Sequence, residues 1–207
     1  PVAEKGRKAS GVRSKIFIVD DHPLVRRGLT EVIDAESHLK VCGEAGGVAD
    51  ALRMVGKIRP DLMIVDLSLD DGSGLNLIKQ VKAQHRTIRI LVSSMHDEFL
   101  FAEQVLRAGA SGYLNKKEAT DRVIEAIDQI LSGRIYLSNA MTERMLNKIW
   151  SGEQDVRTDS LHTLSDRELE VFRLLGEGYA TREIAERLHL SVKTIETYRE
   201  HIKRKLD

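Results

Sequence analysis

Asp66 is the residue of this sequence that is most clearly placed to do chemistry. It follows the apolar run Leu62-Met63-Ile64-Val65 and precedes the polar, glycine-containing loop 70–74. The turn signal Arg59-Pro60-Asp61 bounds the run on its other side, so the pattern predicts a buried strand of a parallel sheet. Asp66 then lies at the carboxyl end of the strand, where ligands bind in open α/β sheets. This signal is weak by itself, because an Asp at a strand end often only starts a turn or caps a helix.

Four other polar residues follow apolar runs in the same way. They are Asp20 and Asp21 after residues 16–19, Ser94 after residues 88–92, and Lys116 after residues 112–114. Because the carboxyl ends of parallel strands share one edge of a sheet, we expect these side chains to gather around Asp66.

Such a cluster is suited to phosphoryl transfer. Three crowded carboxylates repel one another unless a cation joins them, and an all-oxygen site suits Mg²⁺. Asp66 is the candidate nucleophile, since a carboxylate can form an aspartyl phosphate. Lys116 and the Ser94 hydroxyl are candidate donors to the phosphoryl oxygens. Neither His22 nor His96 has a second histidine at ligand spacing, so we expect no transition-metal site.

The elements that must position this cluster alternate along the chain. The expected strands are 16–19, 39–44, 62–66, 88–92 and 112–114, and the expected helices are 23–33, 48–58, 75–84, 97–108 and 118–131. Pro23 suits the first turn of its helix, where a missing N–H costs nothing. Five βα units predict an α/β fold with a five-stranded parallel, doubly wound sheet of flavodoxin-like type.

The C-terminal part predicts a second, all-α domain. Ser165 and Glu168 form a capping box, with Leu164 and Leu169 as a hydrophobic staple, and glycines at 176 and 178 end the helix. A second helix begins at Thr181. The brief turn 189–191 leads into a third helix, which Ser191 caps. Two helices joined by so tight a turn indicate a helix-turn-helix.

The third helix of this domain is the candidate recognition helix. Val192, Ile195, Tyr198, Ile202 and Leu206 form an apolar stripe, and residues 191–206 carry five basic and two acidic side chains. Basic side chains there suit DNA phosphates, and a glutamate can accept a hydrogen bond from cytosine. A solvated helix face is the simpler interpretation of such a pattern. The candidate DNA-binding residues are Arg182, Lys193, Thr194, Glu196, Thr197, Tyr198, Arg199, Glu200, Lys203 and Arg204.

Length and composition limit the remaining possibilities. A chain of 207 residues suits two small domains, and 32 basic against 32 acidic residues leave no global preference for nucleic acid or membrane. Cys42 is the only cysteine, which excludes an internal disulfide and suits a reducing cytoplasm. No apolar run approaches membrane-spanning length. We expect residues 1–14 to be a disordered lead-in, and residues 133–162 to be a linker with a helix at 139–150.

The N-terminal part resembles the receiver domain of bacterial two-component response regulators. The resemblance rests on four motifs in order: Val19-Asp20-Asp21-His22-Pro23, Ile64-Val65-Asp66-Leu67-Ser68, Val92-Ser93-Ser94-Met95-His96 and residues 109–116, Gly-Ala-Ser-Gly-Tyr-Leu-Asn-Lys. It implies that a sensor histidine kinase phosphorylates Asp66. It also implies that Asp21, Asp66 and the Ser68 carbonyl ligate Mg²⁺, with Asp20 acting through water, and that Ser94 and Tyr113 form the switch.

The C-terminal part resembles the LuxR-type DNA-binding domain of the NarL/FixJ regulators. The similar motifs are residues 164–171, Leu-Ser-Asp-Arg-Glu-Leu-Glu-Val, residues 184–188, Ile-Ala-Glu-Arg-Leu, and residues 191–196, Ser-Val-Lys-Thr-Ile-Glu. In that family a fourth helix follows and often forms the dimer contact. Since the chain ends at Asp207, we expect that helix to be absent.

Together the two resemblances predict a cytoplasmic response regulator whose receiver (15–132) controls promoter DNA binding by the domain at 163–207. The receiver is expected to catalyse only its own phosphorylation and dephosphorylation, and phosphorylation is expected to release the DNA-binding helix or to form a homodimer.

Three alternatives stay open. One is a phosphorylation-independent DNA-binding regulator with a degenerate receiver, because Asp70 stands where receivers commonly have proline. The second is a phosphatase of the haloacid dehalogenase type, which also uses an Asp nucleophile with Mg²⁺. Such enzymes need a second Asp two residues after the nucleophile, and that position is Ser68 here, which speaks against this alternative. The third is a ligand-sensing quorum regulator, which would share the C-terminal domain but would not need the acidic cluster at the N-terminal sheet.

Overall fold

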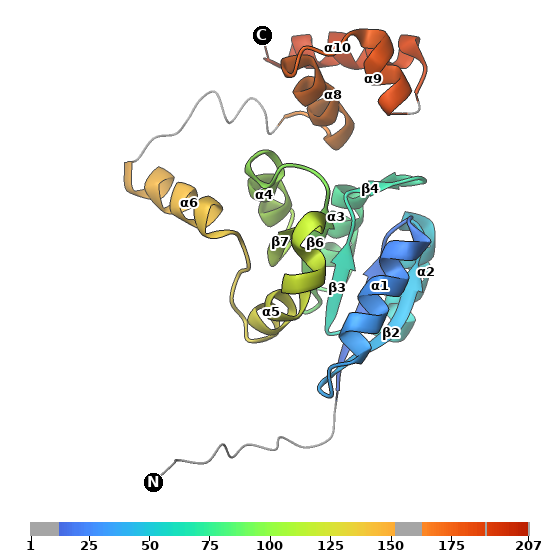
Figure 1. Ribbon diagram of the computed structural model, residues 1–207, viewed down its shortest axis with the longest axis vertical. Coiled ribbons are helices and arrows are strands. Elements are labelled where there is room, and N and C mark those ends of the chain that lie inside the picture. The colour runs from blue at the N-terminus through green and yellow to red at the C-terminus, as the bar shows by residue number, and fades with distance from the viewer. Residues whose placement is uncertain (1–12, 152–162, 189, 207) are drawn as a thin grey trace. The chain divides into compact units, whose positions relative to one another are not determined.

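The computed structural model describes residues 13–151, 163–188 and 190–206, and the chain divides into two compact units, Pro1–Ser138 and Asn139–Asp207 (Figure 1). Residues 1–12 of the predicted lead-in and residues 152–162 of the predicted linker lie outside the described residues, as does His189 of the predicted turn. Within the described ranges, no helix is both long and apolar enough to cross a membrane.

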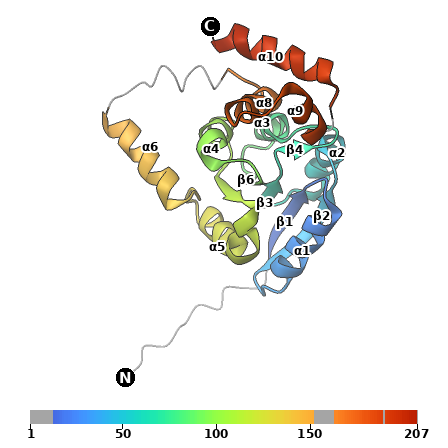
Figure 2. The same cartoon turned by 45° about the horizontal axis from the view of Figure 1, so that its top comes forward.

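The N-terminal unit is built on a five-stranded parallel sheet, as predicted. Its strands are β1 (Ser14–Val19), β2 (Leu39–Ala45), β3 (Leu62–Val65), β6 (Arg89–Ser94) and β7 (Gly112–Asn115). Their order is β2-β1-β3-β6-β7, and Figure 2 shows β6, β3, β1 and β2 side by side in this sequence. The central strand pairs Ile64 with Ile18 on one side and with Leu91 on the other. The carboxyl ends of β1, β3 and β6 therefore lie next to one another.

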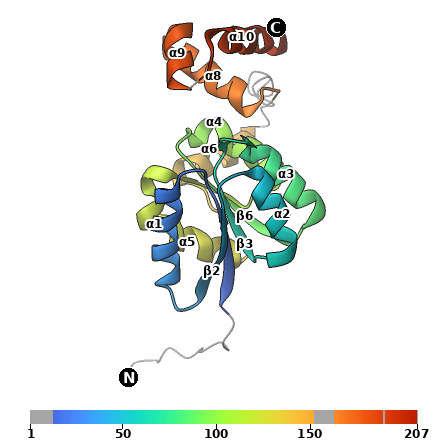
Figure 3. The ribbon, with the colours of Figure 1, turned by 90° about the vertical axis from the view of Figure 1, so that its right-hand side faces the viewer.

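Five helices cover the sheet. They are α1 (Pro23–Asp34), α2 (Val48–Ile58), α3 (Gly74–Gln84), α4 (Glu98–Arg107) and α5 (Ala119–Leu131). Figure 3 shows α1 and α5 on one face and α2 and α3 on the other. Both faces of the central strands are thus covered, which explains why β3 is apolar throughout and fully buried. On the α1/α5 face, Ile16, Ile18 and Ile64 pack with Ile33 and Ile127 in one buried cluster.

Several predicted boundaries shift by one or two residues. β1 begins at Ser14, within the predicted lead-in, and β6 continues to Ser94. The helix expected at 97–108 begins only at Glu98, because the Asp97 side chain accepts a hydrogen bond from the Phe99 amide and caps it. The helix expected at 118–131 is preceded by a 3₁₀ turn, η1 (Lys116–Glu118).

The chain after β3 was expected only as a polar loop at residues 70–74, and the structure adds detail to that expectation. It forms a small antiparallel pair, β4 (Ser68–Leu69) with β5 (Gly72–Ser73). Asp71 at its tip accepts hydrogen bonds from the amides of Val48 and Ala49, at 2.7 and 3.0 Å. The hairpin tip therefore caps the N-terminus of α2, a tertiary contact that the local sequence does not reveal.

The C-terminal unit is helical, as predicted. Its described helices are α6 (Asn139–Ser151), α8 (Asp166–Gly176), α9 (Thr181–Arg187) and α10 (Val192–Leu206). The capping box of Ser165 with Glu168 is confirmed, and so is the Ser191 cap, whose hydroxyl accepts from the Thr194 amide at 3.1 Å. α10 packs against α8 and α9 around a small core, whose buried members are Leu164, Leu169, Val171, Leu174, Ile184, Ala185, Ile195 and Ile202.

Candidate functional site

A buried ion-pair cluster lies at the carboxyl edge of the sheet. Lys116 follows β7, and its Nζ lies 2.5 Å from Asp66 Oδ2, which follows β3, and 2.6 Å from Asp20 Oδ2, which follows β1. Asp66 and Asp20 are only 4% and 2% exposed. The predicted meeting of these three strand ends is confirmed. One ammonium thus bridges two carboxylates in a place that water reaches poorly.

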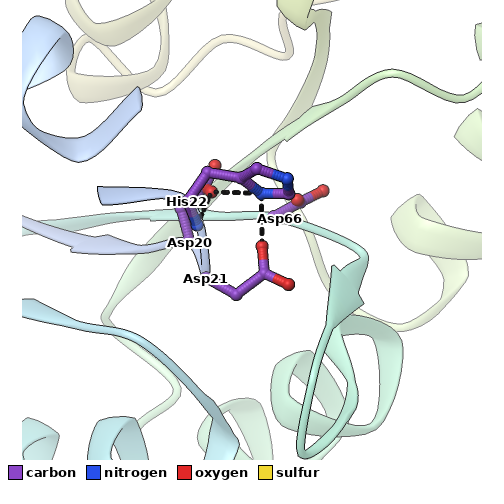
Figure 4. A group of neighbouring side chains, drawn as sticks. All are labelled: Asp20, Asp21, His22 and Asp66. Carbon is purple, nitrogen blue, oxygen red and sulfur yellow. Dashed lines mark hydrogen bonds and ion pairs between the residues drawn. The ribbon is translucent and has the colours of Figure 1, made fainter. Parts of the chain in front are cut away.

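Asp21 and His22 complete the acidic side of the cluster (Figure 4). His22 Nδ1 lies 2.5 Å from Asp21 Oδ1 and 3.4 Å from Asp20 Oδ1, and the His22 amide donates to Asp20 Oδ1 at 2.9 Å. One ligand atom from each of Asp20, Asp21, His22 and Asp66 falls within 4.8 Å of the others. Spacing between histidines gave no signal for His22; its position directly after the two aspartates was the available clue.

Burial sets the electrostatics of the cluster. Burial raises the pKa of Asp66, an effect that the Lys116 ammonium opposes and the nearby Asp20 carboxylate reinforces. For Lys116, burial acts to lower the pKa, but the Asp66 and Asp20 carboxylates outweigh it and the net pKa is raised. Lys116 therefore remains protonated at neutral pH. A single ammonium does not balance the three carboxylates.

The cluster fits a divalent cation such as Mg²⁺. Asp21 Oδ1 is buried and makes no hydrogen bond within the described part of the chain, although the His22 ring touches it. The His22 ring nitrogen is the close polar contact of this buried oxygen among the described residues, and a hard cation with oxygen ligands would satisfy it further. A donor set with three carboxylates is of the type that Mg²⁺ prefers.

The segment after Asp66 is held tightly under the site. The Ser68 amide points to Asp66 Oδ1 at 3.4 Å, and the Ser68 hydroxyl shares a hydrogen bond with His96 Nε2 at 2.8 Å. A Cβ atom on Gly74 would lie 2.0 Å from the Asp66 carbonyl oxygen, so only glycine allows α3 to begin this close. The Ser68–His96 bond was not predicted, because it joins two loops that are distant in sequence.

Ser94 and Tyr113 are both buried next to the cluster, each 1% exposed. The Tyr113 hydroxyl donates to the His96 carbonyl at 2.9 Å, and Ser94 Oγ accepts from the His96 amide at 3.3 Å. Burial raises the pKa of Tyr113, so its phenol stays protonated as a donor. The His96 ring stacks on Phe101 of α4, with ring centroids 4.7 Å apart. His96 thus links the predicted switch pair to the start of α4.

The candidate DNA-binding residues lie mainly on the exposed side of α10. The exposed ones are Lys193, Glu196, Thr197, Arg199, Glu200, Lys203 and Arg204, together with Arg182 at the start of α9. Thr194 and Tyr198 are half-buried, and Arg199 Nη1 donates to Thr181 Oγ1 at 2.7 Å. Ile195 and Ile202 are buried as the stripe predicts. Val192 is not: it begins the helix, one turn before Ile195, and is 42% exposed.

Two family models match the chain. The response regulator receiver domain matches residues 16–128, and the luxR family of bacterial regulatory proteins matches residues 162–207. Among curated relatives, the oxygen regulatory protein NreC of Staphylococcus carnosus (strain TM300) is 34% identical over 197 residues, covering 93% of this chain and 91% of the relative. NreC of Staphylococcus aureus (strain JH9) is 35% identical over 196 residues, covering 93% and 90%.

The chain is also similar to solved structures of response regulators. RcsB of Salmonella enterica serovar Typhimurium, bound to promoter P1flhDC with the phosphomimetic BeF3⁻, matches with a TM-score of 0.61 at 28% identity, covering 94% of this chain and 92% of that chain. A LuxR-family two-component response regulator from Aurantimonas sp. SI85-9A1 matches with a TM-score of 0.61 at 31% identity, covering 66% and 97%.

Proposed function

Since the chain belongs to the LuxR-type (NarL/FixJ) family of two-component response regulators, which control transcription, we propose that phosphorylation of Asp66 by a sensor histidine kinase governs its binding to promoter DNA. The observation that carries this proposal is the buried cluster in which Lys116 contacts both Asp66 and Asp20. Burying these charged groups costs free energy, so their presence around Asp66 favours a receiver that still accepts phosphate.

Asp66 is the acceptor in this proposal. One of its carboxylate oxygens forms a bond to phosphorus while the bond from phosphorus to the kinase histidine nitrogen breaks, and the imidazole leaves. Lys116 pairs with the phosphoryl oxygens, and the Ser94 hydroxyl donates to one of them. The receiver catalyses only this transfer and the later hydrolysis of its own acyl phosphate.

The acidic cluster supports Mg²⁺ as the cofactor. Asp21, Asp66 and the Ser68 carbonyl are the proposed direct ligands, and Asp20 holds the ion through water. When bound, Mg²⁺ supplies positive charge that offsets the carboxylates and the incoming phosphoryl group.

The phosphoryl group is the ligand that shifts the population between two receiver states. Ser94 now accepts a hydrogen bond from the His96 amide. When the Ser94 hydroxyl donates to a phosphoryl oxygen, Ser94 moves away from the His96 amide. The Tyr113 side chain, whose hydroxyl is hydrogen-bonded to the His96 carbonyl, then repacks. The β6–α4 connection is thereby the first part of the chain to respond.

The C-terminal unit supplies the DNA contacts. We assign the receiver to residues 15–132, the linker to 133–162 and the helix-turn-helix domain to 163–207. Arg182, Lys193, Arg199, Lys203 and Arg204 contact phosphates. Glu196, Thr197 and Glu200 face the base edges, and Thr194 and Tyr198 are further candidate contacts. RcsB, which is similar to this chain, has been solved bound to promoter DNA, and this supports a DNA-binding role for the C-terminal unit. Phosphorylation frees this helix or forms a homodimer, and the regulator acts in the cytoplasm.

The test of this proposal is the intact mass of the full chain after incubation with Mg²⁺ and acetyl phosphate. We expect one added phosphoryl group on the unmutated chain, and none on Asp66→Asn or in the presence of chelator. Equal labelling of the Asp66→Asn chain would refute the assignment of the acceptor. If neither acetyl phosphate nor a phosphorylated kinase labels the chain, the phosphorylation-independent regulator becomes the better account.

A further inference from the structure

The chain that leaves the receiver unit is attached to the edge of the sheet. After α5, Tyr136 pairs in parallel with Gly112 of β7. The Tyr113 amide donates to the Tyr136 carbonyl at 2.9 Å, and the Tyr136 amide donates to the Ser111 carbonyl at 3.1 Å. We call the segment 134–138 the strap. It is hydrogen-bonded directly to the backbone of Tyr113, the residue proposed as the aromatic switch.

The strap fits closely against β7. Tyr136 is 3% exposed, and a Cβ atom on Gly112 would lie 2.7 Å from the Tyr136 carbonyl oxygen. Any side chain at position 112 would therefore displace the strap. The Tyr136 hydroxyl is buried and has no hydrogen-bond partner among the described residues. An unpaired buried hydroxyl disfavours the docked position, so the strap is bound less firmly than its burial suggests.

A second anchor connects the strap to α4. The Ser138 amide donates to Glu98 Oε1 at 2.9 Å, and Glu98 is the first residue of α4. This helix starts directly after the connection that contains His96, whose carbonyl accepts the Tyr113 hydroxyl. Covering the edge of the sheet explains why Tyr136 pairs with β7. It does not explain the bond to Glu98, which adds nothing to the sheet.

We propose that the strap transmits phosphorylation of Asp66 to the chain beyond Ser138, with Glu98 as the positioning residue that holds the strap docked in the unphosphorylated state. The inference rests on the proposed function. When Ser94 and Tyr113 repack, the start of α4 shifts, the Glu98–Ser138 bond breaks and residue 138 is released from the receiver. The two anchors lie on β7 and α4, so movement of one relative to the other is sufficient to open the strap.

The first test uses the unphosphorylated full chain and amide hydrogen exchange of residues 134–138. Glu98→Ala removes the acceptor and is expected to speed exchange at Ser138 by about tenfold, since local opening then lacks this bond. Ser138→Pro removes the donor of the same hydrogen bond, and amide exchange at Tyr136 should become faster by a similar factor. Arg134→Ala is the matched control, because the Arg134 side chain donates to Ser132 Oγ and to neither anchor of the strap among the described residues. Unchanged exchange in Glu98→Ala would overturn the proposal.

The second test follows coupling to DNA. Duplexes selected by the unmutated chain from a random-sequence library serve as the probe. Glu98→Ala should accept phosphate normally by intact mass, bind the duplex about tenfold more tightly than the unmutated chain before phosphorylation, and gain less than twofold afterwards. A full phosphorylation response in Glu98→Ala would contradict the strap. Failure of all variants to accept phosphate would instead count against the proposed function, while the exchange measurement still decides the strap.

Discussion

At the scale of single residues, the site depends on an unequal balance of charge. The Lys116 ammonium lies between Asp66 and Asp20, and its side chain is only 9% exposed. Removing one member of a buried ion pair leaves the other charges uncompensated, which costs more than the pair contributes.

Replacing this lysine gives the first prediction. Lys116→Met should lower the free energy of unfolding of the receiver by about 3 kcal/mol in chelator, because two buried carboxylates lose their partner. Saturating Mg²⁺ should restore more stability to this variant than it adds to the unmutated chain, since the ion replaces the missing charge. Urea unfolding with and without Mg²⁺ measures both effects. Lys117→Met, at an exposed neighbour, is the control. Equal Mg²⁺ stabilisation of the variant and the unmutated chain would argue against a cation in this cluster.

The gathering of these residues was predictable because each one ends a strand. An apolar run predicts a strand, a parallel sheet places all carboxyl ends on one edge, and the position of Asp66 beside Asp20 and Lys116 follows. The Ser68–His96 bond and the contact of His22 with Asp21 were not predictable in this way. Both depend on the path of loops, and a histidine in a loop carries no periodic signal.

At the scale of elements, caps formed by distant residues hold helices in place. Asp71, at the tip of the β4–β5 hairpin, receives the first amides of α2, which lowers the pKa of its carboxyl group. Glu168 closes the capping box of α8 and also receives Lys205 Nζ from α10, at 2.5 Å. Each carboxylate connects two elements whose contact the local sequence does not predict.

The hairpin cap gives a prediction with a built-in control. Asp71→Ala should destabilise the receiver by about 1 kcal/mol, the usual cost of losing a helix N-cap. Asp70→Ala removes an exposed carboxylate one residue earlier and should change stability by less than about 0.5 kcal/mol. Urea unfolding of the two variants decides between a structural cap and a general effect of negative charge in this loop. The account fails if the two substitutions cost the same.

The Glu168 bridge predicts a dependence on pH. Burial acts to raise the pKa of Glu168, but Lys205 and the Ser165 backbone outweigh it and the net pKa is lowered. The folded state therefore binds the proton less tightly than the unfolded state. The stabilisation is complete above the ordinary glutamate pKa, about 4.3, and is lost as pH falls through the lower folded value.

Glu168→Gln should remove this part of the pH dependence and destabilise the C-terminal unit by about 2 kcal/mol at neutral pH. Lys205→Met should have a similar effect, and the double variant should cost less than the sum, because both changes break one bond. Amide hydrogen exchange of α8 and α10 in urea, at several pH values, reports on this unit. Additive effects of the two substitutions would contradict a direct bridge.

Local signals predicted most elements correctly. Proline at the start of α1, the Ser165 capping box and the Ser191 cap each act within one helical turn, so the sequence alone indicates them. The β4–β5 hairpin and the strap were missed for the opposite reason. Each is a short segment stabilised by contacts with a distant element, α2 in one case and β7 with α4 in the other.

At the scale of the whole molecule, function depends on coupling between two units that fold around separate cores. The alternation of strands and helices predicted the first unit, and the tight turn between short helices predicted the second. The strength of their coupling is a difference in free energy between two states of the whole chain. A single sequence does not encode that difference in any local pattern, and allosteric coupling typically amounts to about 1–3 kcal/mol.

The most direct measurement is the affinity of the full chain for a selected DNA duplex at fixed salt, before and after phosphorylation with acetyl phosphate and Mg²⁺. We expect phosphorylation to change the affinity of the unmutated chain by about 5- to 150-fold, in the range of ordinary allosteric coupling, and to leave Asp66→Asn unchanged. Intact mass confirms the modification in the same samples. An equal response of Asp66→Asn, or an unchanged affinity in a fully phosphorylated sample, would contradict control of DNA binding through Asp66.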